Sequence, residues 1–289
     1  MINTPKHLAY TLKVDLNEIY SIIQDIDKYY TEVIILKKDK EGLPIIDKNG
    51  KPKSRTLNPS HNRLKIIQKR IQKNILLKLQ LPDYAYGAVK GRDNVDNANV
   101  HRGKKFKFTT DLRNFFPSIS HKRVYDMFRS YSFSPTVSRL LTQLTTYKGR
   151  LPQGSPTSSS IANLVFVKTG KNLDSFSKEH NITFTSFIDD LTFSSPNDFK
   201  SMTNEVLEMV KKDGFKISHN KTNYSRSPIV TGIHPMNNYL RLPDTFDDKL
   251  NAESLSVETK KGLLQYKNKV DKINTKKQRQ QKKNKTASA

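Results

Sequence analysis

The sequence predicts an α+β fold in which an antiparallel sheet carries acidic side chains and is accompanied by amphipathic helices. Two apolar, β-prone runs that contain acidic residues, Phe106 to Phe116 and Phe184 to Phe193, indicate the sheet. Apolar residues that recur at helical spacing elsewhere indicate the helices. At 289 residues, the chain is long enough to bury a substantial core in one large or two small domains.

Composition points to a polyanionic partner. Lys and Arg number 51 against 27 Asp and Glu, which gives a formal net charge of +24 and a pI of about 9.9. Such an excess is typical of nucleic-acid binding. The absence of cysteine excludes disulfides, thiolate zinc sites and cysteine nucleophiles. Apolar runs are too short to span a membrane and no signal-peptide pattern is present, so we expect a soluble cytoplasmic protein with no membrane partner.

The run from Phe184 to Phe193 places Asp189 and Asp190 among aromatic and aliphatic residues. Burying two carboxylates is costly unless a positive group offsets their charge, and a divalent metal is the obvious candidate. Because side chains alternate along a strand, both carboxylates reach one ion only from the turn of a hairpin, between strands at about 182–188 and 191–195. For this run alone, an ordinary surface turn is the favoured alternative.

The run from Phe106 to Phe116 is a second apolar strand that ends in a carboxylate, Asp111. Two-metal phosphoryl transfer requires such carboxylates from separate segments, because two Mg²⁺ ions must bridge an attacking hydroxyl and a leaving phosphate through hard oxygen ligands. Together the two runs predict the palm of a polymerase.

Five motifs in order resemble those of a reverse transcriptase, and such a series is far more specific than any one motif. Two further segments, Asn97 to His101 and Val230 to Gly232, match the motifs that distinguish retron reverse transcriptases from other bacterial ones. The five motifs are Arg55-Thr-Leu-Asn-Pro59, Phe108-Thr-Thr-Asp-Leu-Arg-Asn-Phe-Phe-Pro-Ser118, Leu151-Pro-Gln-Gly-Ser-Pro-Thr157, Phe187-Ile-Asp-Asp190 and Gly214-Phe-Lys-Ile-Ser-His-Asn-Lys-Thr222.

The resemblance implies a right-hand polymerase with fingers, a palm built on an antiparallel sheet, and a short helical thumb. The expected divisions are N-terminal helices and fingers at 1–104, with a fingers hairpin at about 32–57, a palm with interleaved fingers elements at 105–240, a short thumb at 241–275, and a basic disordered tail at 276–289.

The resemblance also implies the catalytic centre. Asp111, Asp189 and Asp190 are the expected metal ligands, and the Leu112 carbonyl completes the shell. Two Mg²⁺ ions, replaceable by Mn²⁺, are the expected cofactors. One motif departs from the family, because Phe187 and Ile188 replace the usual tyrosine and the usual small residue.

Five residues are expected to bind the nucleotide: Lys53, Arg55, Phe116, Gln153 and Lys221. Arg55 is expected to contact the triphosphate, assisted by Lys53 or Lys48. The Phe116 ring is expected to exclude a ribose 2′-hydroxyl, with a core phenylalanine as the alternative. Gln153 is expected to donate an amide hydrogen bond beside Gly154, whose backbone permits close approach. Lys221 is expected to protonate the leaving pyrophosphate, with a surface lysine as the alternative.

The retron-type motifs imply RNA-binding residues. The six are Asn97, Ala98, His101, Val230, Thr231 and Gly232. Asn97 and His101 lie four positions apart, so on a short helix they face the same way. A polar pair that only stabilises the structure is the alternative.

Periodicity and capping residues predict further elements. Asp15 and Glu18 form a capping box for an N-terminal helix, and Ser60 caps a helix from Arg63 to Leu79. Pro117 is expected to end the strand of the Asp111 motif. Other predicted elements are a strand at 32–36, helices at 122–129, 135–147, 156–177, 205–212 and 257–270, and a strand at 215–217.

The retron resemblance implies an RNA-directed DNA polymerase that copies its cognate structured non-coding RNA from a 2′-hydroxyl primer. The product is DNA linked to RNA. Implied partners are that RNA, the RNA–DNA hybrid, deoxynucleoside triphosphates and an effector protein in phage defence. The alternatives are another bacterial reverse transcriptase, from a group II intron or a different defence system, and a non-catalytic RNA-binding scaffold.

Overall fold

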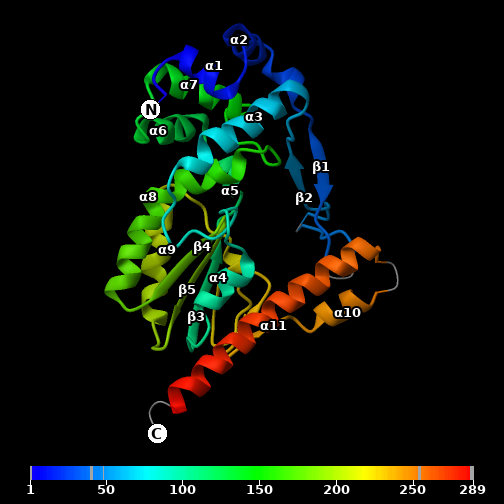
Figure 1. Ribbon diagram of the computed structural model, residues 1–289, viewed down its shortest axis with the longest axis vertical. Coiled ribbons are helices and arrows are strands. Elements are labelled where there is room, and N and C mark those ends of the chain that lie inside the picture. The colour runs from blue at the N-terminus through cyan, green and yellow to red at the C-terminus, as the bar shows by residue number, and fades with distance from the viewer. Residues whose placement is uncertain (1, 40–41, 48, 253–254, 287–289) are drawn as a thin grey trace. The chain divides into compact units, whose positions relative to one another are not determined.

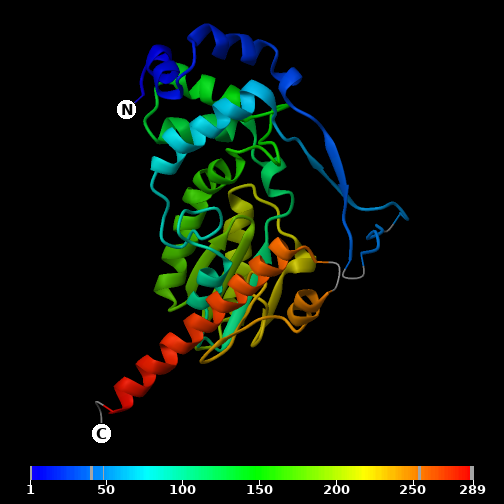
Figure 2. The ribbon, with the colours of Figure 1, turned by 45° about the vertical axis from the view of Figure 1, so that its right-hand side comes forward.

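The computed structural model describes residues 2–39, 42–47, 49–252 and 255–286, with side chains described up to residue 275 (Figures 1 and 2). The chain divides into two compact units. The first combines residues 1–81 with 114–167, and the second combines residues 82–113 with 168–289. Each unit contains helices and antiparallel strands, so the predicted α+β character is confirmed.

The first unit is mainly helical, and its core lies between α1, α3 and α7, where Leu8, Ile67 and Leu141 are fully buried. Long helix α8 begins in this unit and ends in the second. The helices are α1 (Pro5–Leu12), α2 (Leu16–Gln24), α3 (Asn62–Asn74), α5 (Phe115–Ser118), α6 (His121–Ser130), α7 (Pro135–Thr145) and α8 (Ser158–Glu179).

A long hairpin extends from the first unit, as predicted. Strands β1 (Val33–Leu36) and β2 (Ser54–Leu57) pair antiparallel with Ile35 opposite Arg55. Isolated bridges continue the pairing toward the tip, where Gly50 adopts a positive φ of 76° in the turn. Lys48 lies outside the described residues.

The expected ends and caps of two helices need correction. Ser60 does not cap α3, which begins at Asn62 without a side-chain cap, because the Ser60 hydroxyl is buried and donates to Gln68. This helix also ends at Asn74, and a separate 3₁₀ turn follows at Leu76–Lys78. At α2, Asp15 caps the helix by accepting from the Asn17 amide, but the Glu18 carboxylate accepts from Arg63, so the predicted capping box is only half formed.

The second unit contains a four-stranded antiparallel sheet in the order β4-β5-β3-β6, seen below the centre of Figure 1. Aromatic rings fill its core, with Phe193 stacked on Phe184 at 4.7 Å between ring centroids. A small hairpin of two short strands follows. The strands of the sheet are β3 (Phe106–Asp111), β4 (Thr183–Phe187), β5 (Asp190–Ser195) and β6 (Asn223–Ser225), and those of the small hairpin are β7 (His234–Pro235) and β8 (Leu240–Arg241).

Four further helices belong to the second unit: α4 (Asn94–Val100), α9 (Thr203–Lys212), α10 (Thr245–Asn251) and α11 (Val257–Thr286). Helix α11 continues well beyond the predicted end at 270. It therefore includes most of the segment expected to be disordered, since residues 263–286 contain neither Gly nor Pro and are rich in Lys, Gln and Arg, which favour helices.

Two local expectations in the middle of the chain are wrong. The predicted strand at 215–217 is an isolated bridge between Ile217 and Leu112, and β6 is the strand that pairs with β3 on this side. Pro117 does not end a strand, because β3 already ends at Asp111 and Pro117 lies within α5.

Among the described residues, no helix is long and apolar enough to cross a membrane.

Candidate active site

Three aspartates lie at one end of the sheet in the second unit, two of them in strands and one in the turn that precedes β5. Asp111, the last residue of β3, lies directly opposite Asp190, the first residue of β5. Directly opposed residues carry their side chains on the same face, with Cβ atoms about 4.5–5.5 Å apart. The Leu112 amide donates to the Asp189 carbonyl at 2.9 Å, which joins the hairpin turn to the end of β3. The hairpin lies where the sequence predicted it, with Asp189 in the turn, but Asp190, which was also expected in the turn, begins β5.

The turn between β4 and β5 is tight and conformationally unusual. Phe187 pairs with Asp190, so only Ile188 and Asp189 connect the strands. Ile188 has a positive φ of 59°, which is rare for a β-branched residue and is typical of strain at functional sites. Gly87 lies against this turn, since a Cβ on it would fall 2.6 Å from the Ile188 nitrogen.

Gly87 is a site residue that sequence reasoning missed. Its segment runs beside β4, where the Tyr86 amide donates to the Ser186 carbonyl and the Ser186 amide donates to the Tyr84 carbonyl, both at 2.8 Å. The signal available in the sequence was the Tyr-Ala-Tyr-Gly stretch, which alone does not identify the neighbour that excludes a side chain.

The aspartates carry an excess of negative charge. Asp111 is only 6% exposed. Burial, together with the neighbouring carboxylates of Asp189 and Asp111, raises the pKa of Asp190 to about 6. Burial likewise raises the pKa of Asp189. The cluster is therefore costly to ionise fully without an added cation.

Lys221 is the cation that the structure places in this cluster. Its Nζ donates to Oδ2 of Asp111 at 2.6 Å. Burial lowers the pKa of Lys221, but the hydrogen bond to Asp111 and the three carboxylates outweigh burial and raise it above its ordinary value. The side chain remains largely exposed. Lys221 is thus a charged donor beside the acidic residues, as its motif suggested.

The aspartates suit a divalent cation by their chemistry. They supply hard carboxylate oxygens from two paired strands, together with more negative than positive charge. Within the described residues, however, no three His, Cys, Asp or Glu side chains already form a group able to hold a metal. One oxygen of Asp111 is engaged by Lys221. A bound cation would therefore share or replace that contact.

The other four expected nucleotide-binding residues lie in the first unit. Lys53 and Arg55 are exposed on the hairpin, Arg55 within β2 and Lys53 just before it. Phe116 is half-buried in α5, while its neighbour Phe115 is the core residue of the pair. Gln153 is half-buried in the loop before α8.

Within the first unit, two of the motifs are directly attached to one another. The Asn58 amide donates to the Gln153 carbonyl at 2.7 Å. Gly154 has a φ of 102°, and a Cβ there would lie 3.6 Å from the Pro59 nitrogen. The loop that carries Gln153 therefore packs on the segment that follows Arg55.

Gln68 is a second residue that sequence reasoning missed. It hydrogen-bonds Ser60 and Ser155, which lie next to these two segments. The side chain is completely buried in α3. Its Nε2 donates to the Tyr30 hydroxyl at 2.9 Å and to the Leu144 carbonyl at 2.8 Å, and its Oε1 accepts from Ser60 and Ser155. Burial raises the pKa of Tyr30 to about 12, so this hydroxyl stays protonated. One amide thus joins four segments of the unit.

The two retron-type motifs do meet, but mostly below the surface. Asn97 is fully buried and its Nδ2 donates to the Thr231 hydroxyl at 3.2 Å. Ala98 and Val230 belong to one apolar cluster with Val270 of α11. These side chains are not available for direct contact with RNA, because burial removes them from solvent. Their geometry favours the structural alternative.

His101 is also buried, and its two ring nitrogens lie 2.7 Å from the hydroxyls of Ser194 and Thr185. Burial, with smaller contributions from Lys107 and Lys104, lowers the pKa of His101 to about 3. The ring is therefore neutral. Thr231 and Gly232 differ from the other motif residues, because they lie in a turn between Val230 and Ile233 where Gly232 is exposed.

The same region fixes α11 to α4. Lys269 of α11 forms ion pairs with Asp93 and with Asp96, the latter at 3.1 Å. Asn94 donates to the hydroxyl of Tyr266 at 2.7 Å and to the Thr231 carbonyl at 2.9 Å. The motifs therefore form part of an attachment point for the C-terminal helix.

Comparison with known families agrees with the site. Residues 39–282 match the family described as Reverse transcriptase (RNA-dependent DNA polymerase). Because the match covers well over half of the chain, this chain belongs to the reverse transcriptase family.

Several relatives are retron enzymes, which confirms the predicted retron resemblance. Retron Se72 reverse transcriptase of Salmonella heidelberg (strain 579083-10) is 38% identical over 183 residues, 59% of this chain and 48% of that protein. Retron Ec86 reverse transcriptase of Escherichia coli is 31% identical over 180 residues, with coverages of 61% and 56%. Retron Mx162 reverse transcriptase of Myxococcus xanthus is 30% identical over 212 residues, with coverages of 62% and 44%. The chain thus spans about half the length of these relatives.

Proposed function

We propose that this chain is an RNA-directed DNA polymerase of a retron, which copies a structured non-coding RNA into DNA. The observation that carries the proposal is the pairing of Asp111 with Asp190 across β3 and β5, with Asp189 attached to the end of β3 and Lys221 on Asp111. Membership of the reverse transcriptase family and the ordered motifs support the same reaction.

In this proposal the chain forms a right-hand polymerase. Residues 105–240 are the palm, residues 1–104 supply N-terminal helices and fingers, and residues 241–275 supply a short thumb. The antiparallel sheet with its acidic end supports the palm assignment, and the long hairpin of β1 and β2 supports the fingers assignment.

Asp111, Asp189 and Asp190 would hold divalent cations, which we propose are Mg²⁺, and the Leu112 carbonyl would complete the shell. Such cations supply Lewis-acid stabilisation of the charge on the reacting phosphate. Lys221 is protonated, because its pKa is raised, and can donate its Nζ proton to the leaving pyrophosphate.

The remaining nucleotide contacts are assigned to the first unit. Arg55 and Lys53 are exposed cations on the hairpin and suit the triphosphate. Gln153 offers its side-chain amide from a loop held by Asn58, and half-buried Phe116 offers its ring to the sugar.

The proposed partners are the template and primer RNA, the RNA–DNA hybrid and deoxynucleoside triphosphates. Priming from a 2′-hydroxyl of the RNA gives a branched RNA–DNA product. A retron of this kind acts with an effector protein in phage defence.

Primer extension tests the catalytic assignment. The double variant Asp189→Asn with Asp190→Asn should abolish extension while leaving RNA affinity nearly unchanged, because phosphate contacts dominate affinity and lie elsewhere. Asp174→Asn is the matched control, since Asp174 is paired with Lys178 on α8 outside the acidic cluster. Extension retained by the double variant would refute the metal assignment.

Nucleic acid that copurifies with the chain tests the retron assignment. We expect a small DNA whose mobility changes after RNase or debranching treatment. DNA unaffected by either treatment would favour another bacterial reverse transcriptase, and RNA binding without synthesis by the wild-type chain would favour a non-catalytic scaffold.

A further inference from the structure

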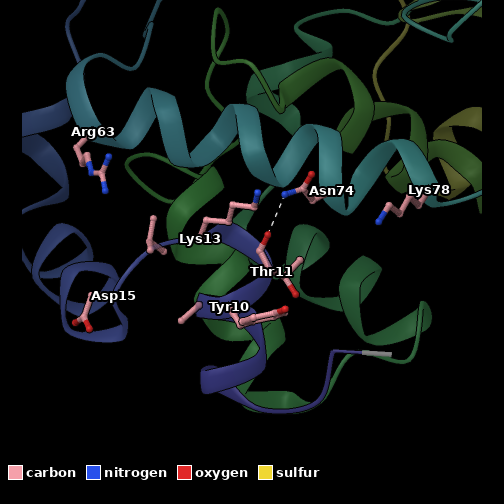
Figure 3. A pocket seen from close by; sticks show the side chains of 9 residues that line it. Tyr10, Thr11, Lys13, Asp15, Arg63, Asn74 and Lys78 are labelled. Atoms are coloured by element: carbon pink, nitrogen blue, oxygen red, sulfur yellow. Dashed lines mark hydrogen bonds between the residues drawn. The ribbon is translucent and has the colours of Figure 1, made fainter.

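A groove in the first unit lies apart from every motif discussed so far. Helix α3 forms one wall and α1 with the following turn forms the other (Figure 3). Its volume is about 760 Å³, and its polar lining comprises Tyr10, Thr11, Lys13, Asp15, Arg63, Asn74 and Lys78. The volume is in the range of ligand sites.

The walls are joined by polar contacts that do not use the groove's free cations. Asn74 donates to the Thr11 carbonyl at 2.9 Å, shown by the dashed line in Figure 3. Arg70 donates to the carbonyls of Leu12 and Lys13 at 2.9 and 2.6 Å, which satisfies the end of α1. The groove is therefore formed before any ligand arrives.

Two cations in the groove are available to a ligand. Lys13 and Lys78 make no ion pair or side-chain hydrogen bond in the part of the chain that the structure describes. In contrast, Arg63 is held by Glu18, and the Asp15 carboxylate accepts from the Asn17 amide. The acidic lining residue is thus occupied while the two lysines are not.

Tyr10 adds an exposed aromatic surface. It is 84% exposed, and its ring packs on no other aromatic ring among the described residues. An exposed ring in a groove that also carries unpaired lysines is suited to an unpaired base, which stacks on the ring while its phosphates meet the cations.

We propose that this groove binds a single-stranded nucleic-acid segment through a base stacked on Tyr10 and phosphates on Lys13 and Lys78. A base within a duplex cannot expose its face to Tyr10, so the ligand is an unpaired segment. The proposal rests on the proposed function only in expecting this strand to be RNA; stacking and phosphate contact apply equally to DNA. It adds to the proposed nucleotide and RNA contacts a surface that none of the motifs includes.

Binding of a fluorescent 12-nucleotide oligouridylate to the full chain tests this proposal. Tyr10→Ala should weaken binding by roughly five- to a hundredfold, the effect of losing one stacked base, whereas Tyr10→Phe should stay within about twofold of wild type. Tyr20→Ala is the matched control, because Tyr20 is exposed on α2 outside the groove.

A salt titration tests the lysines. The double variant Lys13→Gln with Lys78→Gln should lower the slope of log affinity against log salt by about 1.4, the value for two phosphate contacts on a single strand. Lys65 is exposed on α3 outside the groove, so Lys65→Gln should lower the slope of log affinity against log salt by less.

Equal losses for oligouridylate and oligodeoxythymidylate support the proposal and identify stacking and phosphate as the recognised chemistry. A larger loss for oligouridylate supports it with RNA as the strand. Unchanged binding by Tyr10→Ala, with its thermal unfolding unchanged, overturns it. The proposal is also overturned if the lysine variant weakens binding while Tyr10→Ala does not. That result would indicate an anionic ligand such as an acidic peptide, which needs the cations and not the ring. Wild-type primer extension is measured in parallel, and its absence counts against the polymerase proposal while the binding result stands.

Discussion

Gln68 shows how one buried amide can control the shape of a surface loop. Its four partners belong to different segments, including the loop that carries Gln153 and the residue that follows the Arg55 motif. Because every polar atom of the amide is used, no apolar side chain of similar size can replace it without leaving buried partners unpaired.

Gln68→Leu should therefore destabilise the chain by at least about 3 kcal/mol, because several buried groups each lose a partner at about 1–3 kcal/mol. The loosened loop should also raise KM for deoxynucleotides by a larger factor than it lowers kcat. Chemical denaturation and steady-state extension measure the two effects.

Gln72→Leu is the control for this change. Gln72 lies one turn further along α3 and donates to Ser160 of α8 at 2.7 Å, without touching the Gln153 loop. Its KM should match wild type. Equal KM values for both variants would assign Gln68 a purely stabilising role.

His101 makes stability depend on pH. Its pKa is about 3 in the folded chain and about 6.5 when unfolded, so between these values the unfolded state binds more protons. The contribution of neutral His101 to the free energy of unfolding is fully present above pH 6.5 and is lost as the pH falls toward 3. From pH 7 to pH 5 the loss should be about 2 kcal/mol.

Denaturation at both pH values, compared with His101→Gln, isolates this effect. The stability advantage of wild type over the variant should shrink by about 2 kcal/mol at pH 5. His7→Gln, a change at an exposed histidine of α1, is the control. A constant difference between wild type and His101→Gln would contradict a neutral buried ring.

Sequence reasoning at this scale succeeded where the signal was local. Asp111, Asp189 and Asp190 stand out because carboxylates interrupt apolar runs. Gln68 gave no such signal, because its partners lie 8, 38, 76 and 87 positions away. The burial of Asn97 was equally hidden, since its partner Thr231 is 134 positions distant.

The elements of the sheet followed their local patterns, whereas several element ends did not. Both acidic strands and the β1–β2 hairpin lie where apolar alternation and turn residues predicted them. Ser60 failed as a cap because a tertiary partner, Gln68, takes its hydroxyl. The end of α11 could not be read from periodicity, because its polar C-terminal part has helix-forming residues without an apolar stripe.

The β4–β5 hairpin depends on its neighbour Gly87. Gly87→Ala would place a methyl group 2.6 Å from the Ile188 nitrogen, so the turn must shift. A displacement near 1 Å at reacting groups can cost roughly a hundredfold in rate. We therefore expect about a hundredfold slower primer extension with little change in RNA affinity.

Gly262→Ala provides the matched control. Gly262 lies in α11, where a Cβ would meet nothing within 4 Å beyond the adjacent residues and the backbone of its own helix, so this change should stabilise the helix by about 0.5–1 kcal/mol and leave extension unchanged. Wild-type extension by Gly87→Ala would mean that the turn yields without disturbing the aspartates.

The whole molecule is dominated by its net charge of +24. Residues 276–289 contribute six cations and no acid: Lys276, Lys277, Arg279, Lys282, Lys283 and Lys285. Counterion release makes RNA affinity fall steeply with salt, in proportion to the phosphates neutralised.

Truncation after Thr275 should weaken RNA binding at low salt and lower the slope of log affinity against log salt by up to about 5. Extension at saturating RNA should change much less, because the acidic residues lie elsewhere in the second unit. Filter binding between 50 and 200 mM salt measures the slope, roughly the interval over which such contacts are most sensitive. An unchanged slope would show that this segment does not meet phosphate.

Because the register sets Asp111 opposite Asp190, the active site is sensitive to the number of residues in the connection between β4 and β5. Because successive strand residues face opposite sides, inserting or deleting one residue in the Ile188–Asp189 connection would turn the downstream carboxylate toward the wrong side of the sheet. Substitutions within this connection preserve that orientation, whereas an odd change in its length does not. Chains descended from a common ancestor with this one should therefore vary the side chain at position 188 far more readily than the spacing between the two strands.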